Sequence, residues 1–450
     1  MSTASTSMRK EERGEIDVYK VTAIPLARAI KLAFSVPPTI GTLVLGPPGI
    51  GKTETVRKFA ELEAQKLNKE FIDLNEKKAT LTEEDYNTLL RDIYKNPEKY
   101  YVFVMVPFGR VLPEDLLGYP TLVHIKDGDK TLMVVEESAM KAPLAILTVP
   151  GVHGVLLIDD ALNINDNVRK SFLLAVFNER VVGGFGGAKL SSNVRVIGTG
   201  NLTAHSELAT AVPSPMTGRA QIVLVKEEDL KSWYHYMQTK HGDNWFKEVY
   251  AFLGRYENYY SRYDLKEETT SRAPVPRSWE KLAVALHAIR DEVKELLSKG
   301  PEEFQILTGI VASHVGYEAA AQFVAFISKP YISVDEVVAN PKRLDEVVKD
   351  MDVVYRFSVE LGSKISKAIE EGDKAKVITY LGVLKDLMEK TTEDIGVFVY
   401  ETLSKENRSK LKKMVMTEAV SKDTRTREIA VKIRNLIASI TVADTLIGRG

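Results

Sequence analysis

The sequence predicts an α/β fold in which a parallel sheet is followed by a long helical region. Between residues 40 and 225, short apolar runs alternate with segments of helical periodicity, which is typical of parallel strands joined by helices. From residue 226 onward the periodicity is almost wholly helical. Because 450 residues exceed one ordinary core, we expect several domains. They are a disordered tail at 1–17, an α/β core at 18–225 with a hairpin insert at 121–135, a helical lid at 226–330 and a C-terminal helical domain at 331–450.

The expected strands are short apolar runs, the usual pattern of buried parallel strands. They cover residues 42–45, 101–107, 154–160, 194–199 and 222–225. Two alternating runs around 126–130 predict a hairpin, and glycines at 183–187 mark the tip of another. Helical patterns cover 20–34, 54–67 and 165–177, with a polar helical insertion at 69–100. Beyond the sheet we expect an aromatic core segment at 229–263, two or three helices at 278–330 and an extended piece at 331–334.

One segment fits a known phosphate-binding pattern. Residues 46–53 read Gly-Pro-Pro-Gly-Ile-Gly-Lys-Thr, matching G-x-x-x-x-G-K-[ST] between an apolar strand and a helix. The glycines allow backbone N–H groups to converge on phosphate oxygens, and the helix adds the positive end of its dipole. Lys52 can neutralise the β- and γ-phosphates, and the Thr53 hydroxyl can bind Mg²⁺. The sequence therefore predicts a site for ATP and Mg²⁺, and the alternative is a glycine-rich turn that merely opens a helix.

We expect the nucleotide to be bound by the loop and the residue after it: Gly46, Pro47, Pro48, Gly49, Ile50, Gly51, Lys52, Thr53 and Glu54.

Two carboxylates follow a later apolar strand. Residues 154–158 lead directly into Asp159 and Asp160. Ligands of open α/β sheets bind at the carboxyl ends of the strands, so this pair is expected near the loop. Asp159 would hold Mg²⁺ through water, and Asp160 would orient or deprotonate the attacking water. Considered alone, a strand that ends in a solvated acidic turn explains the pair equally well.

Three further polar residues have the order that an ATPase acting between subunits needs. Asn201 ends a strand and can hydrogen-bond the γ-phosphate and the attacking water. Arg219 precedes the last strand and can reach a neighbouring subunit's site, where it would offset charge on the transferred phosphoryl group. Arg277 follows Pro276 at a helix start in the lid and can lie over the phosphates. Each alone is most simply a capping or surface residue, and only their spacing behind the loop favours the functional interpretation.

The composition excludes several classes of site. The 61 Lys and Arg nearly balance the 62 Asp and Glu, so net charge does not mark a general nucleic-acid binder. Without cysteine there are no disulfides or thiolate metal sites, and the 7 histidines are scattered. No run of about 18 apolar residues and no apolar signal core is present, so we expect a cytoplasmic protein without a membrane association. Residues 401–450 carry eleven Lys or Arg against six Asp or Glu. Lys405, Arg408, Lys412 and Lys413 can share a basic helix face, which is most simply solvated.

On these motifs the chain resembles the AAA+ ATPases, and more narrowly the MoxR-like branch of their helix-2-insert clade. The resemblance covers about residues 20–330. It rests on GPPGIGKT at 46–53, PEDLLGYP at 113–120, the hairpin at 121–135, LLIDD at 156–160, GTGN at 198–201, TGRA at 217–220 and PRSW at 276–279. It implies an ATPase in a homo-oligomeric, hexameric ring with ATP at subunit interfaces. It also implies remodelling or maturation of partner proteins, which often bear von Willebrand factor A domains.

The chain departs from the family pattern in three places. Asp160 stands where the family usually has Glu, an arrangement similar to that of bacterial replication initiators, so hydrolysis is still expected. The usual Arg-Phe pair is missing at Arg219, and residues 331–450 resemble no family. Two other functions stay open: a nucleic-acid-associated motor, and a structural ring with little turnover. The related restriction GTPases carry Asn-Thr-x-x-Asp after this strand, which Asn201-Leu202-Thr203-Ala204-His205 does not match.

Overall fold

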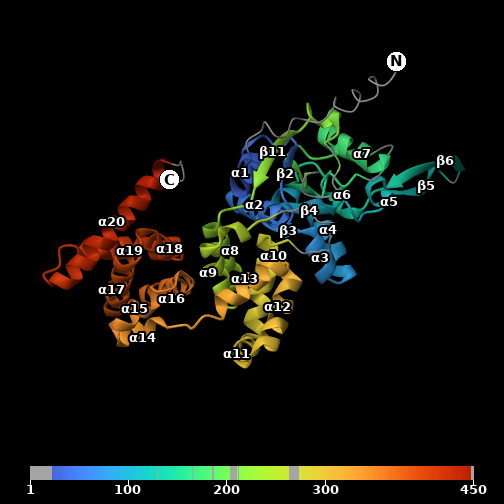
Figure 1. The fold of residues 1–450 in the computed structure, drawn as a ribbon. Coiled ribbons are helices and arrows are strands. Elements are labelled where there is room, and N and C mark those ends of the chain that lie inside the picture. Colours follow the sequence, from blue (N-terminus) through green and yellow to red (C-terminus); the bar gives the residue numbers. More distant parts are fainter. Residues whose placement is uncertain are drawn as a thin grey trace, which may run out of the picture. The chain divides into compact units, whose positions relative to one another are not determined.

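The computed structural model describes residues 23–128, 130–164, 166–184, 187–202, 210, 212–262 and 273–446. It divides into two compact units, one ending at Glu228 and the other beginning at Asp229 (Figure 1). The tail expected at 1–17 lies outside the described residues.

The first unit is built on a seven-stranded parallel sheet, which confirms the expected α/β core. Its strands are β1 Ile24–Pro25, β2 Thr42–Leu45, β3 Glu70–Asp73, β4 Tyr100–Pro107, β7 His153–Asp159, β10 Val194–Gly200 and β11 Gln221–Lys226. The order across the sheet is β1-β11-β2-β10-β7-β4-β3. Residues 70–73 were expected to lead into a helical insertion but form edge strand β3, where partial exposure permits a polar pattern. Strand β2 lies between β11 and β10, so the loop after it opens where the strand order reverses, the usual ligand position of such sheets.

Helices cover both faces of the sheet. On one face α1 Leu26–Ser35 and α2 Lys52–Lys66 pack against side chains such as Val155 and Leu157 of β7. Their neighbours Leu156 and Ile158 point to the other face, where α4 Glu83–Lys95, α6 Ala142–Ile146 and α7 Asn167–Leu174 supply the cover. Because strand side chains alternate between faces, a sheet buried on both sides needs continuous apolar runs. That requirement explains why the strands could be recognised in the sequence.

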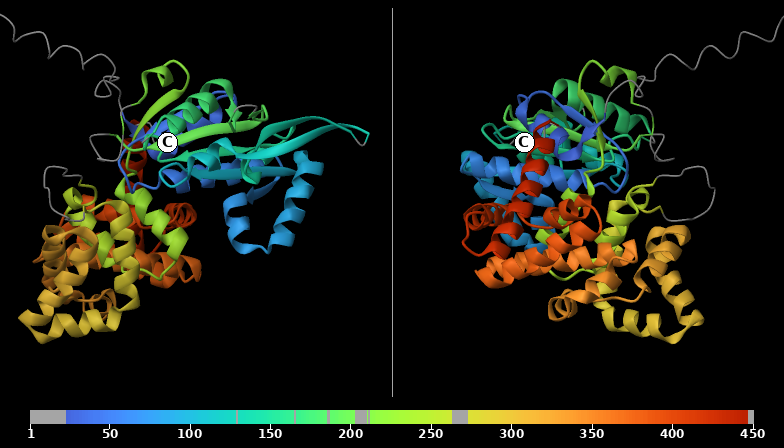
Figure 2. Two further views of the ribbon diagram at one scale, coloured as in Figure 1. Left: turned by 90° about the vertical axis from the view of Figure 1, so that its right-hand side faces the viewer. Right: turned by 60° about the vertical axis from the view of Figure 1, so that its left-hand side comes forward.

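Two antiparallel hairpins are added to this core. The larger pairs β5 Tyr119–Asp127 with β6 Lys130–Ala139, directly after α5 Pro113–Leu117, and it extends away from the sheet (Figure 2). It confirms the hairpin expected at 121–135 and is longer at both ends. The smaller pairs β8 Val181–Val182 with β9 Ala188–Lys189. In the expected insertion α3 Leu74–Thr80 precedes α4, and a π-helical turn over Ala175–Glu179 follows α7.

The second unit is helical throughout its described part. Its helices are α8 Leu230–His241, α9 Glu248–Arg255, α10 Pro276–Ala288, α11 Arg290–Lys299, α12 Pro301–Val315, α13 Tyr317–Ile327, α14 Val334–Ala339, α15 Leu344–Val347, α16 Met351–Glu370, α17 Lys374–Lys390, α18 Glu393–Glu401, α19 Lys405–Glu418 and α20 Thr424–Leu446. Four helices lie between Pro276 and Ile327, so the expectation of two or three was wrong. Only Ile289 separates α10 from α11, without a glycine or proline to signal the break. None of the described helices has both the length and the apolar composition needed to cross a membrane.

Aromatic packing joins the helices before residue 330 to those after it. Phe398 of α18 stacks on Tyr250 of α9 with ring centroids 5.0 Å apart and an angle of 8° between the planes. Gly254 permits this approach, because a Cβ atom there would lie 2.3 Å from the Phe398 ring. Nearby, the buried Asp352 accepts a hydrogen bond from the Tyr256 hydroxyl at 3.0 Å and pairs with Lys329 at 2.6 Å. A division of this unit at residue 330 stays a prediction.

A half-buried histidine makes a further contact of this kind. Arg408 of α19 donates to Nε2 of His235 in α8 at 3.0 Å, which requires the neutral imidazole as acceptor. Burial, followed by the charges of Arg408 and Lys231, lowers the pKa of His235 to about 4. The same arginine also donates to the carbonyls of Tyr400 and Glu401. Arg408 therefore turns inward and does not belong to the basic helix face expected from the sequence.

Candidate functional site

The predicted phosphate loop lies between β2 and α2, as its sequence requires. Gly49 and Gly51 have φ angles of 78° and 86°, in the left-handed region that suits glycine, and Gly51 caps α2. Gly46 is needed for space, because a Cβ atom there would lie 2.4 Å from the carbonyl oxygen of Val225 in β11. The loop therefore ends at the N-terminus of a 15-residue helix, where unpaired N–H groups and the helix dipole favour an anion.

Lys52 is buried inside this loop. Its ammonium donates to the carbonyls of Gly46 and Pro47 at 3.0 and 2.8 Å, and to Asn201 Oδ1 at 2.9 Å. Asn201 follows β10, so the contact joins two neighbouring strand ends. The geometry thus brings the loop cation and the predicted amide to one place at the carboxyl edge of the sheet.

The predicted carboxylate Asp159 meets the loop from the other side. Its Oδ1 accepts hydrogen bonds from the hydroxyls of Thr53 at 2.7 Å and Thr199 at 2.6 Å. Thr199 was not predicted from the sequence. It stands two residues before Asn201 and so shares a face of β10 with it, a period-two signal that could have identified it.

Asp160 follows directly but leaves the strand. Its φ angle is 54°, and its carbonyl accepts from the N–H of Asn163 at 2.8 Å in a tight turn. Left-handed backbone is uncommon outside glycine, and Asp and Asn are the side chains that tolerate it best. The side chain is exposed at the same edge of the sheet as the loop.

Arg219 lies at the opposite edge of the sheet from the loop of its own chain. It precedes β11, whose first residue Gln221 pairs with Thr42, the first residue of β2. The loop begins only after the last residue of β2. Parallel strands place these two points at opposite ends, so Arg219 and Lys52 do not meet within one chain. The Arg219 side chain is exposed.

Two other arginines of this unit, Arg180 and Arg195, are engaged in internal contacts. Arg180 donates to the carbonyls of Pro38 and Ser191 at 2.9 and 2.8 Å, and Arg195 makes a two-pronged contact with Glu63 at 3.0 and 3.2 Å. A further arginine, Arg272, lies outside the described residues.

The last two predicted residues stand apart from these contacts. Arg277 is exposed in the first turn of α10 and belongs to the second unit. Glu54 is exposed in the first turn of α2, where a carboxylate favours the helix dipole.

The oxygen donors next to the loop suit a hard divalent cation. Thr53 offers a hydroxyl and Asp159 a carboxylate, the ligand types that Mg²⁺ takes from proteins. In the described part of the chain, no group of three or more His, Asp or Glu residues is arranged to hold a metal. Mg²⁺ at a nucleotide usually keeps several waters and takes other positions from phosphates, so Thr53 would bind it directly and Asp159 through one of the waters.

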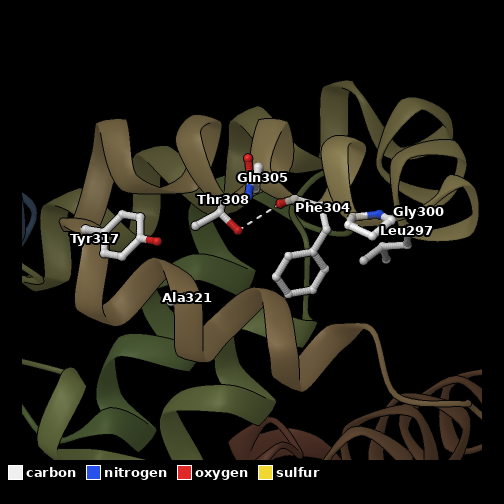
Figure 3. A pocket seen from close by; sticks show the side chains of 8 residues that line it. Leu297, Gly300, Phe304, Gln305, Thr308, Tyr317 and Ala321 are labelled. Carbon is white, nitrogen blue, oxygen red and sulfur yellow. Dashed lines mark hydrogen bonds between the residues drawn. The ribbon is translucent and has the colours of Figure 1, made fainter.

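A groove in the second unit is a separate feature. It lies between α12 and α13 of the second unit, with a volume of about 870 Å³ (Figure 3). Phe304, Thr308 and Tyr317 line it, and the Thr308 hydroxyl is already engaged by the Phe304 carbonyl at 2.8 Å. None of its eight lining residues, all within the described ranges, carries a charge. A triphosphate would find no counter-charge there, so this groove is not the nucleotide site.

Comparison with known proteins adds little to this geometry. No family model and no curated protein matches the chain. Solved structures similar to it include NtrX from Brucella abortus in complex with ADP, with 15% identity over 84% of this chain and 70% of that chain and a TM-score of 0.34. NtrX in complex with ATP has 14% identity over 84% of this chain and 69% of that chain, with a TM-score of 0.28. The FIGL-1 AAA domain in complex with ADP has 14% identity over 72% of this chain and 84% of that chain, with a TM-score of 0.26. All three TM-scores are below 0.5, so these likenesses carry no argument about this chain.

Proposed function

We propose that this chain is an AAA+ ATPase that hydrolyses ATP with Mg²⁺ in a homo-oligomeric ring. The observation that carries the proposal is the convergence of Lys52, Thr53, Asp159 and Asn201 at one sheet edge through contacts of 2.7–2.9 Å. A glycine-rich turn that merely opened a helix would not require a buried lysine, a strand-end carboxylate and a strand-end amide to meet there.

Each group then has a chemical task. Lys52 and the loop amides bind the phosphates, Asn201 positions the attacking water, and Asp160 accepts the proton of that water. Mg²⁺, held by Thr53 and Asp159 together with the phosphates, would supply charge neutralisation at the β- and γ-oxygens. Catalysis of this kind is positioning plus electrostatic stabilisation, which suits a site made of fixed strand ends.

The placement of Arg219 supports the proposal of a ring. An exposed arginine at the end of the sheet opposite its own loop does not reach that loop, and we propose that it acts at the site of another subunit, where it would offset charge on the transferred phosphoryl group. Arg277 at the start of α10 is proposed to act on the γ-phosphate from the lid. The long hairpin β5–β6 after the PEDLLG segment supports the MoxR-like branch. We therefore propose that the ring, a hexamer by analogy, remodels or matures protein partners, among which von Willebrand factor A-type proteins are candidates.

ATP binding and phosphate release test the proposal directly. Lys52→Ala should lower turnover by on the order of 10²-fold or more, because the loop loses its point charge at the phosphates. Lys58→Ala is the matched control, since Lys58 is exposed on the same helix and the charge change is identical. Equal ATP affinity and turnover in the two variants would refute the site. Retained binding with negligible wild-type turnover would favour the structural ring, and turnover stimulated by DNA would favour the nucleic-acid motor.

A further inference from the structure

We propose that Thr199 is a positioning residue for Mg²⁺: it fixes the rotation of the Asp159 carboxylate so that the metal–nucleotide complex finds its ligand already oriented. The inference rests on the proposed ATPase function. Thr199 belongs neither to the phosphate loop nor to the carboxylate pair Asp159 and Asp160.

The first argument is the shared acceptor. Thr199 Oγ1 and Thr53 Oγ1 both donate to the same oxygen, Asp159 Oδ1, at 2.6 and 2.7 Å. Both of these hydrogen bonds end on Oδ1 and not on Oδ2. The two hydroxyls therefore hold Oδ1 of the carboxylate, and Oδ2 is left for a ligand.

The second argument is the rigidity of the donor. Thr199 is fully buried in β10, the strand between β2 and β7, and pairs with Val44 of β2. Its carbonyl accepts from the N–H of Ala161 at 2.7 Å, directly after the two carboxylates. Strand and turn thus hold the backbone of Thr199 on both sides, and its branched side chain has few rotamers. Because the Thr199 hydroxyl is held in place, it can fix the orientation of the Asp159 carboxylate that it contacts.

The third argument is the softness of the acceptor. The terminal torsion of an aspartate is broad, so a carboxylate held by one donor can turn. Thr53 is also expected to bind the cation, so its hydroxyl is a changing partner during binding, whereas Thr199 is a constant one. Partners behind a metal ligand typically contribute 10–100-fold to metal affinity by such orientation.

The experiment compares Thr199→Val, which keeps the shape and removes the hydroxyl, with Thr199→Ser, which keeps the hydroxyl. Binding of fluorescent ATP is titrated with Mg²⁺ in the full-length protein, and repeated with EDTA. Paramagnetic Mn²⁺ provides a second reading that does not involve turnover. We expect Thr199→Val to raise the half-saturating Mg²⁺ concentration by about 10–100-fold with little change in the EDTA affinity, and Thr199→Ser to restore it. Thr42→Val is the control, a buried threonine at the opposite end of neighbouring β2.

The outcomes are distinct. An unchanged Mg²⁺ midpoint in Thr199→Val, or an equal loss in Thr199→Ser, overturns the positioning role while leaving the ATP site intact. A loss of EDTA affinity as large as the loss with Mg²⁺ assigns Thr199 to packing and overturns it too. Wild type without Mg²⁺-dependent ATP binding overturns the proposed function and this inference together. If Thr199→Val fails to fold, Thr199→Ala and Thr199→Ser are compared by the same criteria.

Discussion

Arg219 provides the most discriminating test of the ring. Between Thr42, beside Gln221, and the loop at Gly46 lies roughly 13 Å of strand, to which the step from Arg219 to Gln221 must be added. A contact within one chain would have to span the sheet, so the guanidinium is expected to act on a neighbour. Arginines that act in this way contribute about 10³–10⁵ to the rate in other NTPases, so Arg219→Ala should be nearly inactive.

Mixing two inactive variants measures this directly. In rings formed from equal amounts of Arg219→Ala and Asp160→Asn subunits, an interface works only if an intact Asp160 faces an intact Arg219. With random assembly about one quarter of the interfaces qualify, so phosphate release should return to roughly a quarter of the wild-type rate if interfaces act independently. Light scattering with and without a slowly hydrolysed ATP analogue establishes that rings form.

The refuting result is a flat mixing curve in rings whose subunits demonstrably exchange, because an arginine acting in its own chain leaves every site in the mixture defective. Such a curve would remove Arg219 from the site. Arg272 would become the next residue to test, since Arg180 and Arg195 are engaged by internal contacts.

Three further predictions concern single positions. Asp160→Asn should fold normally and bind ATP but hydrolyse it slowly. Asp160→Ala should in addition lose about 1 kcal/mol of unfolding free energy, because alanine tolerates the left-handed backbone less well. Equal melting temperatures of the two variants would contradict this loss of stability. Gly254→Ala should destabilise the protein by about 1–3 kcal/mol, since its new Cβ collides with the stacked Phe398 ring. The control Gly309→Ala, in a helix position with open space, should stabilise by up to about 1 kcal/mol, and denaturant unfolding distinguishes the two. The pKa of His235 in the folded protein is lowered to about 4, so its contribution to stability is complete above the ordinary pKa near 6.5 and is lost as the pH falls. The free energy of unfolding should decrease by roughly 1–2 kcal/mol between pH 7 and pH 4.5, a value that allows for solvent screening. Thermal melting measured against pH should show a flatter profile for His235→Gln than for the wild type.

The inner strands of the sheet and the contacts at the centre of the site could be predicted from the sequence because both have short-range signatures. A strand buried on two faces must be continuously apolar, as residues 154–158 are, and a phosphate loop requires glycines at fixed spacing. Edge strand β3 escaped recognition because one-sided exposure allows a polar pattern. The break between α10 and α11 escaped it because α10 ends at Ala288 without a glycine or proline after it.

Contacts between distant segments were harder to predict. The period-two spacing of Thr199 and Asn201 indicates which way Thr199 points, but it does not identify Asp159, 40 positions earlier, as its partner. That pairing depends on β10 lying beside β7. Arg408 was expected on a solvated face, since helix periodicity gives the direction of a side chain but does not identify its neighbours. Its inward turn depends on α8, more than 160 residues away in sequence.

The packing of Phe398 against Tyr250 and Gly254 determines where the chain can be divided into fragments for separate expression. A fragment that ends near residue 330 would lose the aromatic side chain of Phe398. Helix α9 would then expose Tyr250 and Gly254 to water. Exposed aromatic surface of that kind promotes self-association. A fragment beginning near residue 331 would expose the opposite half of the same contact. The smallest piece suited to separate expression is therefore the whole helical unit from Asp229 onward, and limited proteolysis should release it intact.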